Sequence, residues 1–192
     1  METYYQLRQR RVVDEGGEDL DAIGLECDDE ILEWPWRQGV RFDPPPPIPL
    51  KMRIEADASA DGYFRDYLAS PVPVFSRRLA AALQAAGVSN LELFAIDVED
   101  TVDWPAFPGY VAVNVIGTVS VADPARSVAN KAFGVDGANL FDKFVPRTDI
   151  ACGLSMFRSA EQLSTILVSE KVRSRCLAAG IDTVDFVPLS ER

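Results

Sequence analysis

The sequence contains no histidine, and this absence excludes several classes of enzyme. Histidine is the side chain that most often serves as a general base and as a transition-metal ligand near neutral pH. Without it, Ser–His–Asp triads, His-assisted cysteine nucleophiles and most transition-metal enzymes are excluded. Chemistry based on carboxylates or on lysine is still compatible with the sequence.

Cysteine is scarce as well. Cys27, Cys152 and Cys176 are too few and too widely spaced for a disulfide framework or a zinc site. We therefore expect three free thiols without a redox role, with Cys152 in a strand and Cys176 at a core position of a helix. No cofactor and no metal ion is expected.

Long apolar runs are also missing. No stretch reaches the roughly 18 apolar residues that a membrane-spanning helix needs. The first residues, METYYQLRQRR, contain no apolar segment of the kind found in secretion signals. These two features lead us to expect a cytoplasmic protein without a membrane partner.

Lysine and arginine are absent from Val12 to Glu33, where most of the negative charge is concentrated. The formal net charge of the chain is -11, and this stretch alone holds ten acidic residues, Asp14, Glu15, Glu18, Asp19, Asp21, Glu26, Asp28, Asp29, Glu30 and Glu33. Phosphate binding requires a basic face, so we expect no nucleic-acid partner. The run is either a contact surface for a basic protein or a solvated segment that keeps the protein soluble.

A helix–turn–strand pattern occurs twice, at residues 75–96 and 168–188, with an offset of about 93 residues. Ser76 aligns with Ser169, and Gly87 aligns with Gly180. In each segment the serine predicts a helix N-cap, the glycine predicts the left-handed residue that ends the helix, and alternating apolar residues predict a strand. Either the element is recurrent, with both helices packed on one sheet, or two ordinary segments merely look alike.

The remaining patterns predict an α+β domain with a mixed, mostly antiparallel sheet. We expect a single domain over 1–192, with an acidic and proline-rich N-terminal arm at 12–47 and an α+β body at 48–192. Expected strands are Thr3–Leu7, Ile48–Ile54, Tyr110–Val121 as the central one with an interruption at Gly117, Phe141–Val145 as a strand or turn, and Asp149–Arg158; Tyr63–Leu68 is expected as a short helical turn.

Two groups of residues are candidates for a functional surface. Trp34 and Trp36, on either side of a proline, are large enough to fill the core or to anchor a partner. A second acidic group contains Asp97, Glu99, Asp100, Asp103 and Trp104. Its carboxylates could form a metal or acid–base site, although the nearby prolines and glycine are typical of a solvated loop.

The last two-thirds of the chain contain a series of packing motifs: Ser70-Pro71, Ser76–Gly87, Leu91–Ile96, Tyr110–Asn114, Met156–Arg158, Ile166–Ser169, Leu177–Ile181 and Val184–Pro188. In these motifs the chain resembles the Imm11 (DUF1629) family, immunity proteins of bacterial polymorphic toxin systems. The match covers roughly residues 70–188 and not the acidic N-terminal third, and Ala112 stands where the family tends to have a larger residue. The resemblance implies a protein that binds and neutralises a toxin and has no catalytic residues.

The charge and the resemblance lead to one expectation, a non-enzymatic binding protein whose partner is a basic toxin or effector. The contact face is expected to contain either Asp28, Asp29 and Glu30 with the two tryptophans, or the 97–104 segment. Two alternatives belong to other classes. One is a carboxylate- or metal-dependent hydrolase that uses the second acidic group, and the other is an adaptor that self-associates through a sheet edge.

Overall fold

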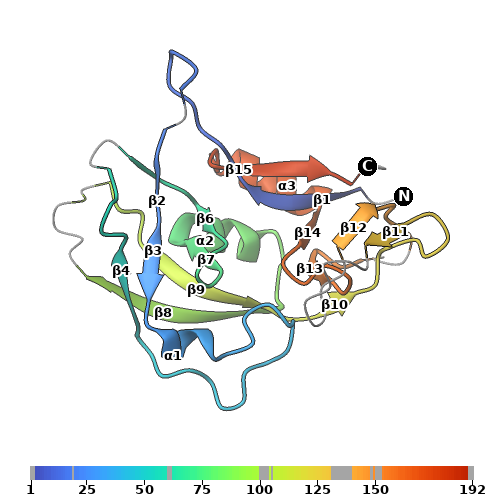
Figure 1. Cartoon of the computed structure of the whole chain (residues 1–192), viewed down its shortest axis with the longest axis horizontal. Coiled ribbons are helices and arrows are strands. Elements are labelled where there is room, and N and C mark those ends of the chain that lie inside the picture. The colour runs from blue at the N-terminus through green and yellow to red at the C-terminus, as the bar shows by residue number, and fades with distance from the viewer. Residues whose placement is uncertain are drawn as a thin grey trace.

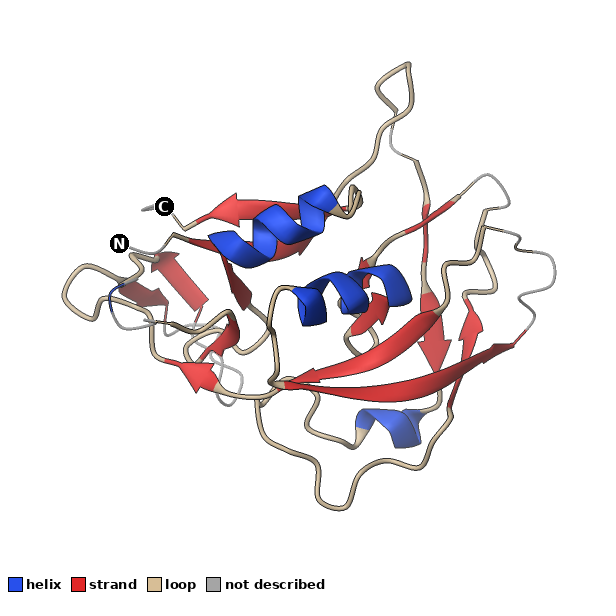
Figure 2. Cartoon of the chain, turned by 180° about the vertical axis from the view of Figure 1, so that it is seen from behind, coloured by secondary structure: helices blue, strands red, loops and turns tan. Residues whose placement is uncertain are grey.

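The computed structural model describes residues 3–18, 20–59, 62–99, 104, 106–130, 140–147, 149 and 153–189. Two sheets pack against one side of a pair of helices, whose other side is exposed to solvent (Figures 1 and 2). Neighbouring strands are antiparallel except in the pairs β4–β8 and β10–β13 of these sheets and in the small pair β2–β5. The predicted α+β class with a mixed, mostly antiparallel sheet is confirmed. None of the described helices is long and apolar enough to cross a membrane.

The elements are distributed over the sheets as follows. The six-stranded sheet has the order β3 (Leu25–Cys27), β4 (Leu50–Ile54), β8 (Leu91–Glu99), β9 (Tyr110–Val115), β7 (Val74–Ser76) and β6 (Tyr67–Leu68). The five-stranded sheet has the order β10 (Thr118–Val119), β13 (Met156–Ser159), β14 (Ile166–Ser169), β1 (Tyr4–Gln9) and β15 (Val184–Pro188). Two small pairs are β2 (Ala22–Ile23) with β5 (Tyr63–Phe64) and β11 (Val128–Asn130) with β12 (Leu140–Lys143); the helices are α1 (Asp29–Leu32), α2 (Arg77–Ala85) and α3 (Glu170–Ala178).

Both predicted helix–turn–strand segments form, and both helices end in the same way. Gly87 and Gly180 have φ values of 90° and 71°, the left-handed conformation expected after a helix. The next amide then bonds back into the helix, from Val88 N to Leu83 O and from Ile181 N to Cys176 O, both at 3.1 Å. These bonds satisfy carbonyl groups that the helix ends would otherwise leave open.

The repeated structural unit includes strands from outside the two similar sequence segments. In the first copy β9 lies between β7 and β8, and in the second copy β1 lies between β14 and β15. The registers agree, since Ser76 pairs with Tyr110 and Ser169 pairs with Tyr4. Flanking strands β6 and β13 also correspond, because each is antiparallel to the strand that enters the helix. The chain therefore contains two equivalent four-stranded units, one of which takes its middle strand from the N-terminal end of the sequence.

The main core lies between the sheets and includes both helices. Leu79 and Leu83 of α2 meet Val172 and Cys176 of α3, all fully buried. Alternate residues of the six-stranded sheet face a second core on the sheet's other side, where Trp36 belongs to the apolar cluster. Successive side chains along a strand point to opposite sides of the sheet, so this one sheet contributes residues to both cores.

The acidic and proline-rich segment 12–47 does not stand apart from the body. Ile23, Leu25, Ile31 and Phe42 are buried, and most of them belong to the second core. β3 pairs with β4, while α1 lies on the side of the sheet opposite α2 (Figure 2). The apolar residues between the acidic ones therefore fold this segment onto the sheet.

Three sequence predictions differ from the structure. Tyr63–Leu68 forms β5 and β6 instead of a helical turn, because β2 and β7 supply strand partners that outweigh local preference. The expected strand Tyr110–Val121 is interrupted at Gly117 as predicted, but its two parts lie in different sheets, because Gly117, with a φ of 93°, turns the chain from β9 in one to β10 in the other. Of the expected strand Asp149–Arg158, only Met156 onward is in β13, and residues 148 and 150–152 lie outside the described part.

Candidate protein-binding face

The outward side chains of three neighbouring strands, β3, β4 and β8, form one charged surface. Along β4, Leu50 and Met52 point into the second core, so Lys51 and Arg53 point to the other side. The register places Glu26 of β3 opposite Arg53, and Arg53 opposite Glu99 of β8. We call this surface, with Asp28 at the end of β3, the acidic face; α1 itself lies on the other side of the sheet, with the second core.

Carboxylates outnumber cations on the acidic face. Arg53 is paired with two of them, with Glu26 Oε2 2.9 Å from its Nε and Asp28 Oδ1 3.4 Å from its Nη1. Lys51 is paired with Asp97, its register partner on β8. These pairs are exposed to solvent and so stabilise the fold little. Because the further carboxylates of Glu55 and Glu99 accompany them, the face is net negative.

The first turn of α1 places its acidic residues in solvent. Asp28 is the N-cap residue, but its carboxylate makes no capping bond and instead approaches Arg53. Asp29 and Glu30 are exposed. Acidic residues also favour the start of a helix electrostatically, so their position has a structural use besides any contact with a partner.

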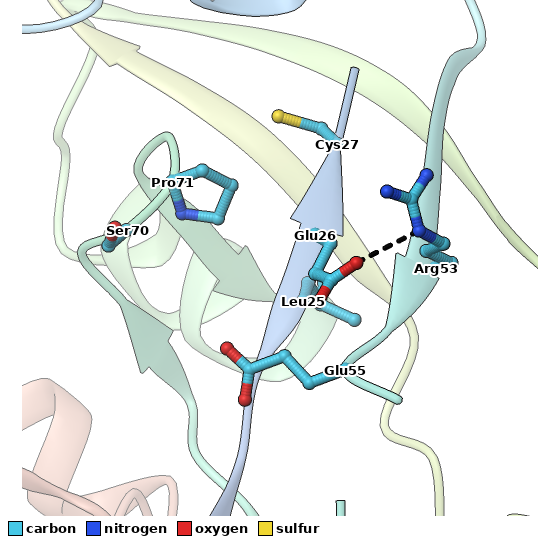
Figure 3. A pocket seen from close by; sticks show the side chains of 7 residues that line it. All are labelled: Leu25, Glu26, Cys27, Arg53, Glu55, Ser70 and Pro71. Atoms are coloured by element: carbon cyan, nitrogen blue, oxygen red, sulfur yellow. Dashed lines mark hydrogen bonds and ion pairs between the residues drawn. The ribbon is translucent and has the colours of Figure 1, made fainter. Parts of the chain in front are cut away.

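A groove runs along the edge of the acidic face, between β3 and the Ser70–Pro71 segment (Figure 3). It has a volume of about 390 Å³. Glu55 reaches the groove by lying over Gly24, since a Cβ at that glycine would be 2.2 Å from Glu55 Oε1. The groove is therefore lined by the carboxylates of Glu26 and Glu55, by the guanidinium of Arg53 and, at Pro71, by an apolar ring.

A second depression of about 350 Å³ continues from the first, and Pro71 lines both. Leu32, 46% exposed, and the half-buried Trp34 contribute apolar surface to it. The indole Nε1 of Trp34 donates to Pro44 O at 3.3 Å, which fixes the ring beside the depression. Trp34 is thus placed where a partner can reach it.

Trp36, the other predicted contact residue, faces inward. It is 4% exposed, its Nε1 donates to Ile31 O at 2.7 Å, and its ring packs edge-on against Phe42 and Phe94. The sequence alone left core and surface open for both tryptophans, and the structure separates them. Trp36 packs against α1 from the core side, and its ring exposes almost no surface that a partner could contact.

Two arginines that the sequence did not single out as site residues hold the walls of the depressions. Arg37 Nη2 donates to Ala69 O at 2.9 Å, and Arg158 donates to Trp36 O at 3.0 Å and to Leu163 O at 2.8 Å. Burial lowers the pKa of Arg158 to about 10, so the guanidinium is still charged at neutral pH. An arginine directly after two apolar residues of β13, Met156 and Phe157, was the available sequence signal.

The second acidic group is only partly described. Asp97 and Glu99 are exposed on the acidic face, whereas Asp100 and Asp103 lie outside the described residues. Trp104 is half-buried, with its ring edge-on to Phe64 at a centroid distance of 5.8 Å. The structure therefore places Asp97 and Glu99 on the same side of the sheet as Asp28, whereas Asp29 and Glu30 belong to α1 on the sheet's other side.

The chemistry available at these residues is limited to charge and contact in what the structure describes. Within the described ranges, no three His, Cys, Asp or Glu side chains are grouped to hold a metal ion. Cys27, which lines the groove, is a free thiol whose pKa is raised by burial and then by Asp28, so it stays protonated at neutral pH. Cys176 is free and buried, and Cys152 lies outside the described residues.

Comparison with known proteins adds no assignment. A scan against protein-family models finds no match, and a search of curated proteins finds none either. The resemblance to Imm11 proteins stays a prediction from the sequence, and the function has to be argued from the acidic face and its groove.

Proposed function

We propose that this protein binds a basic toxin or effector protein and neutralises it by covering its working surface, without catalysing a reaction. This is the role implied by its resemblance to Imm11 immunity proteins. The observations that carry the proposal are the acidic face on β3, β4 and β8, the exposed carboxylates of α1, and the accessible apolar residues Leu32 and Trp34 in the second depression. An inhibitor of this kind needs a complementary surface and no reactive groups.

The two parts of the surface would contribute in different ways. The carboxylates of the acidic face attract a basic partner over a distance and speed its association, while Leu32 and Trp34 supply apolar area once the partner has docked. A buried aromatic anchor inside a charged rim is the usual arrangement of a tight protein interface.

The proposed site of action is the cytoplasm, and the proposed complex contains no cofactor. The free thiols of Cys27 and Cys176 support this location, because reduced cysteines persist in reducing compartments.

Charge reversal on α1 tests the proposal. The change Asp29→Lys with Glu30→Lys leaves the N-cap residue Asp28 and the core in place. Binding should be measured by stopped-flow mixing with a purified basic toxin domain of a polymorphic toxin system, over a series of salt concentrations. We expect association about tenfold slower at low salt and a flatter salt dependence, because electrostatic steering is lost.

The matched control is Glu15→Lys with Glu18→Lys, which changes the net charge equally. These residues lie in the exposed turn after β1, which projects at the top of Figure 1 while α1 lies at the bottom. Equal slowing by both variants would mean that net charge and not the position of these carboxylates steers the partner. Failure of the native protein to bind or to protect cells from the toxin would refute the proposed function, as would turnover of a substrate by the purified protein.

A further inference from the structure

The solvent-exposed side of the helix pair contains a groove between α2 and α3. The helices are antiparallel, since Arg78 near the start of α2 donates to Gly180 O beyond the end of α3 at 3.4 Å, while Lys171 at the start of α3 lies beside Gly87 after α2 (Figure 2). The groove has a volume of about 280 Å³ and is lined by Ala86, Lys171, Ser174, Arg175 and Ala178. Its small side chains leave room for a third helix to approach closely.

Two cations line this groove, and neither forms an ion pair with another described residue. Lys171 and Arg175 are both exposed and lie one helical turn apart, about 6 Å along the axis at roughly 1.5 Å per residue. A Cβ at Gly87 would be 3.3 Å from Lys171 Nζ, so the ammonium lies at the C-terminal end of α2. The dipole of α2 favours a cation there and positions the ammonium without neutralising it.

The carboxylates near the two helices are already engaged by other groups. Glu170 Oε1 accepts from Arg173 Nη1 at 3.0 Å and from Ser174 Oγ at 2.7 Å, so the hydroxyl that lines the groove is also used. Asp182 pairs with Arg78 at 3.2 Å. No acidic side chain lines the groove in the described part of the chain. The groove is therefore positively charged over a floor of small residues, in a chain whose net charge is -11.

We propose that this groove binds a helix of a second protein, one that presents two carboxylates one turn apart with small residues beside them. The carboxylates pair with Lys171 and Arg175, and the small residues pack on Ala86 and Ala178. Charge complementarity requires an acidic partner, and it excludes the same helix pair of a second copy, which would bring like charges together. The inference is independent of the proposed function, because it concerns another surface and a partner segment of opposite charge.

Two helical peptides test the groove with the full chain. Both are end-blocked and made of alanine and glutamine, about 16 residues long so that a helix forms in water. One carries two glutamates four residues apart, on one face, and the other carries them two residues apart, on different faces. Titration into isotope-labelled protein is followed by amide NMR signals. We expect saturable shifts centred on Lys171, Ser174 and Arg175 with the first peptide, and about threefold weaker binding of the second, because one exposed ion pair is lost.

Removal of the two cations is the matching change in the protein. Lys171→Ala with Arg175→Ala leaves α3 intact, because alanine is a strong helix former. The matched control is Lys143→Ala with Arg41→Ala, which deletes the same two residue types from exposed positions outside the helices. We expect the groove variant to bind the first peptide about tenfold more weakly, because both ion pairs are lost, and the control to stay within about twofold of the native protein.

Four results would overturn the proposal. They are the absence of shifts at the groove at millimolar peptide, equal binding of the two peptides, equal loss of binding in the groove variant and its control, and self-association of the free protein that the groove variant abolishes. The last would mean that an acidic segment of a second copy occupies the groove. Should the groove variant fail to fold, the two peptides decide the question with the native chain. Loss of toxin binding would not affect the inference, since the peptides are measured without the toxin.

Discussion

The two copies of the strand–helix–turn–strand unit share a backbone plan but differ in the chemistry at the start of the helix. In both, the first helical amide donates to the strand beside it, from Arg77 N to Gly109 O and from Glu170 N to Thr3 O, each at 3.0 Å. In both, a buried serine precedes the helix. The backbone alone therefore satisfies the same amide in each copy.

The serine side chains behave differently. Ser76 Oγ accepts from Leu79 N at 3.1 Å and donates to Asp66 Oδ1 at 2.5 Å, so the N-cap is complete. Ser169 makes no capping bond, and its buried hydroxyl has no partner among the described residues. The comparison shows that one residue type at equivalent positions can stabilise one helix and contribute little to the other.

Asp66 is the source of the difference. It is 1% exposed, and both carboxylate oxygens bond to Arg78, at 2.6 Å and 2.7 Å. Thr183, from the turn of the second copy, donates to Asp66 Oδ2 at 2.8 Å. One buried carboxylate thus joins the first helix to the second copy. The corresponding place before α3 has no such group in the described residues.

Removing the Asp66 carboxylate should lower the free energy of unfolding more than any of the other changes below. Asp66→Ala leaves Arg78, Ser76 and Thr183 without their common acceptor, and we expect the free energy of unfolding to fall by about 3 kcal/mol. The half-exposed Arg78 can turn to water, which limits the loss. Urea unfolding at pH 7 measures it.

Asp182→Ala is the control for the Asp66 variant. Asp182 also pairs with Arg78, at 3.2 Å, but its side chain is 75% exposed. Its removal should change stability by less than about 1 kcal/mol. Similar losses in the two variants would show that the charge of Arg78, and not the buried network, matters.

Lowering the pH should gradually remove the stabilisation that the ionised Asp66 carboxylate provides. Burial alone would raise the pKa of Asp66, but hydrogen bonds from Arg78, Ser76 and Thr183 outweigh it and hold the pKa below the usual value. A carboxylate with a lowered folded-state pKa stabilises the fold above its unfolded pKa of about 4, and loses this contribution as pH falls through the folded pKa. The difference in unfolding free energy between native protein and Asp66→Asn should therefore shrink below about pH 4. A difference that stays constant between pH 7 and pH 3 would contradict this assignment.

Local signals made the helices and their ends predictable from the sequence. Serine before the helix and glycine after it act within one turn, so their effect does not depend on distant residues. The middle strand of the second unit could not be found in this way. Its residues Tyr4 to Gln9 lie about 160 positions before β14, and the fixed offset between the two copies gives no reason to look there.

The candidate face was predictable in its charge but not in its arrangement. The acidic run indicated Asp28 and its surroundings, yet the parallel pairing of β4 with β8 is what places Asp97 and Glu99 on the same side of the sheet as this residue. The distinction between Trp34 and Trp36 depends on Phe42 and Phe94, which close over only one of the rings. Contacts between distant parts of the chain decide both features.

The smallest expected effect separates the two serines directly. Ser76→Ala removes a complete N-cap and a bond to Asp66, and should lower the free energy of unfolding by about 1–2 kcal/mol. Ser169→Ala removes a buried hydroxyl without a partner, so we expect no loss or a gain of up to about 1 kcal/mol. The two changes delete the same atom from equivalent buried positions, so each is the control for the other in urea unfolding under one set of conditions. If both variants lose stability equally, the hydroxyl of Ser169 has a partner in solution, and the difference between the copies lies in packing instead of capping.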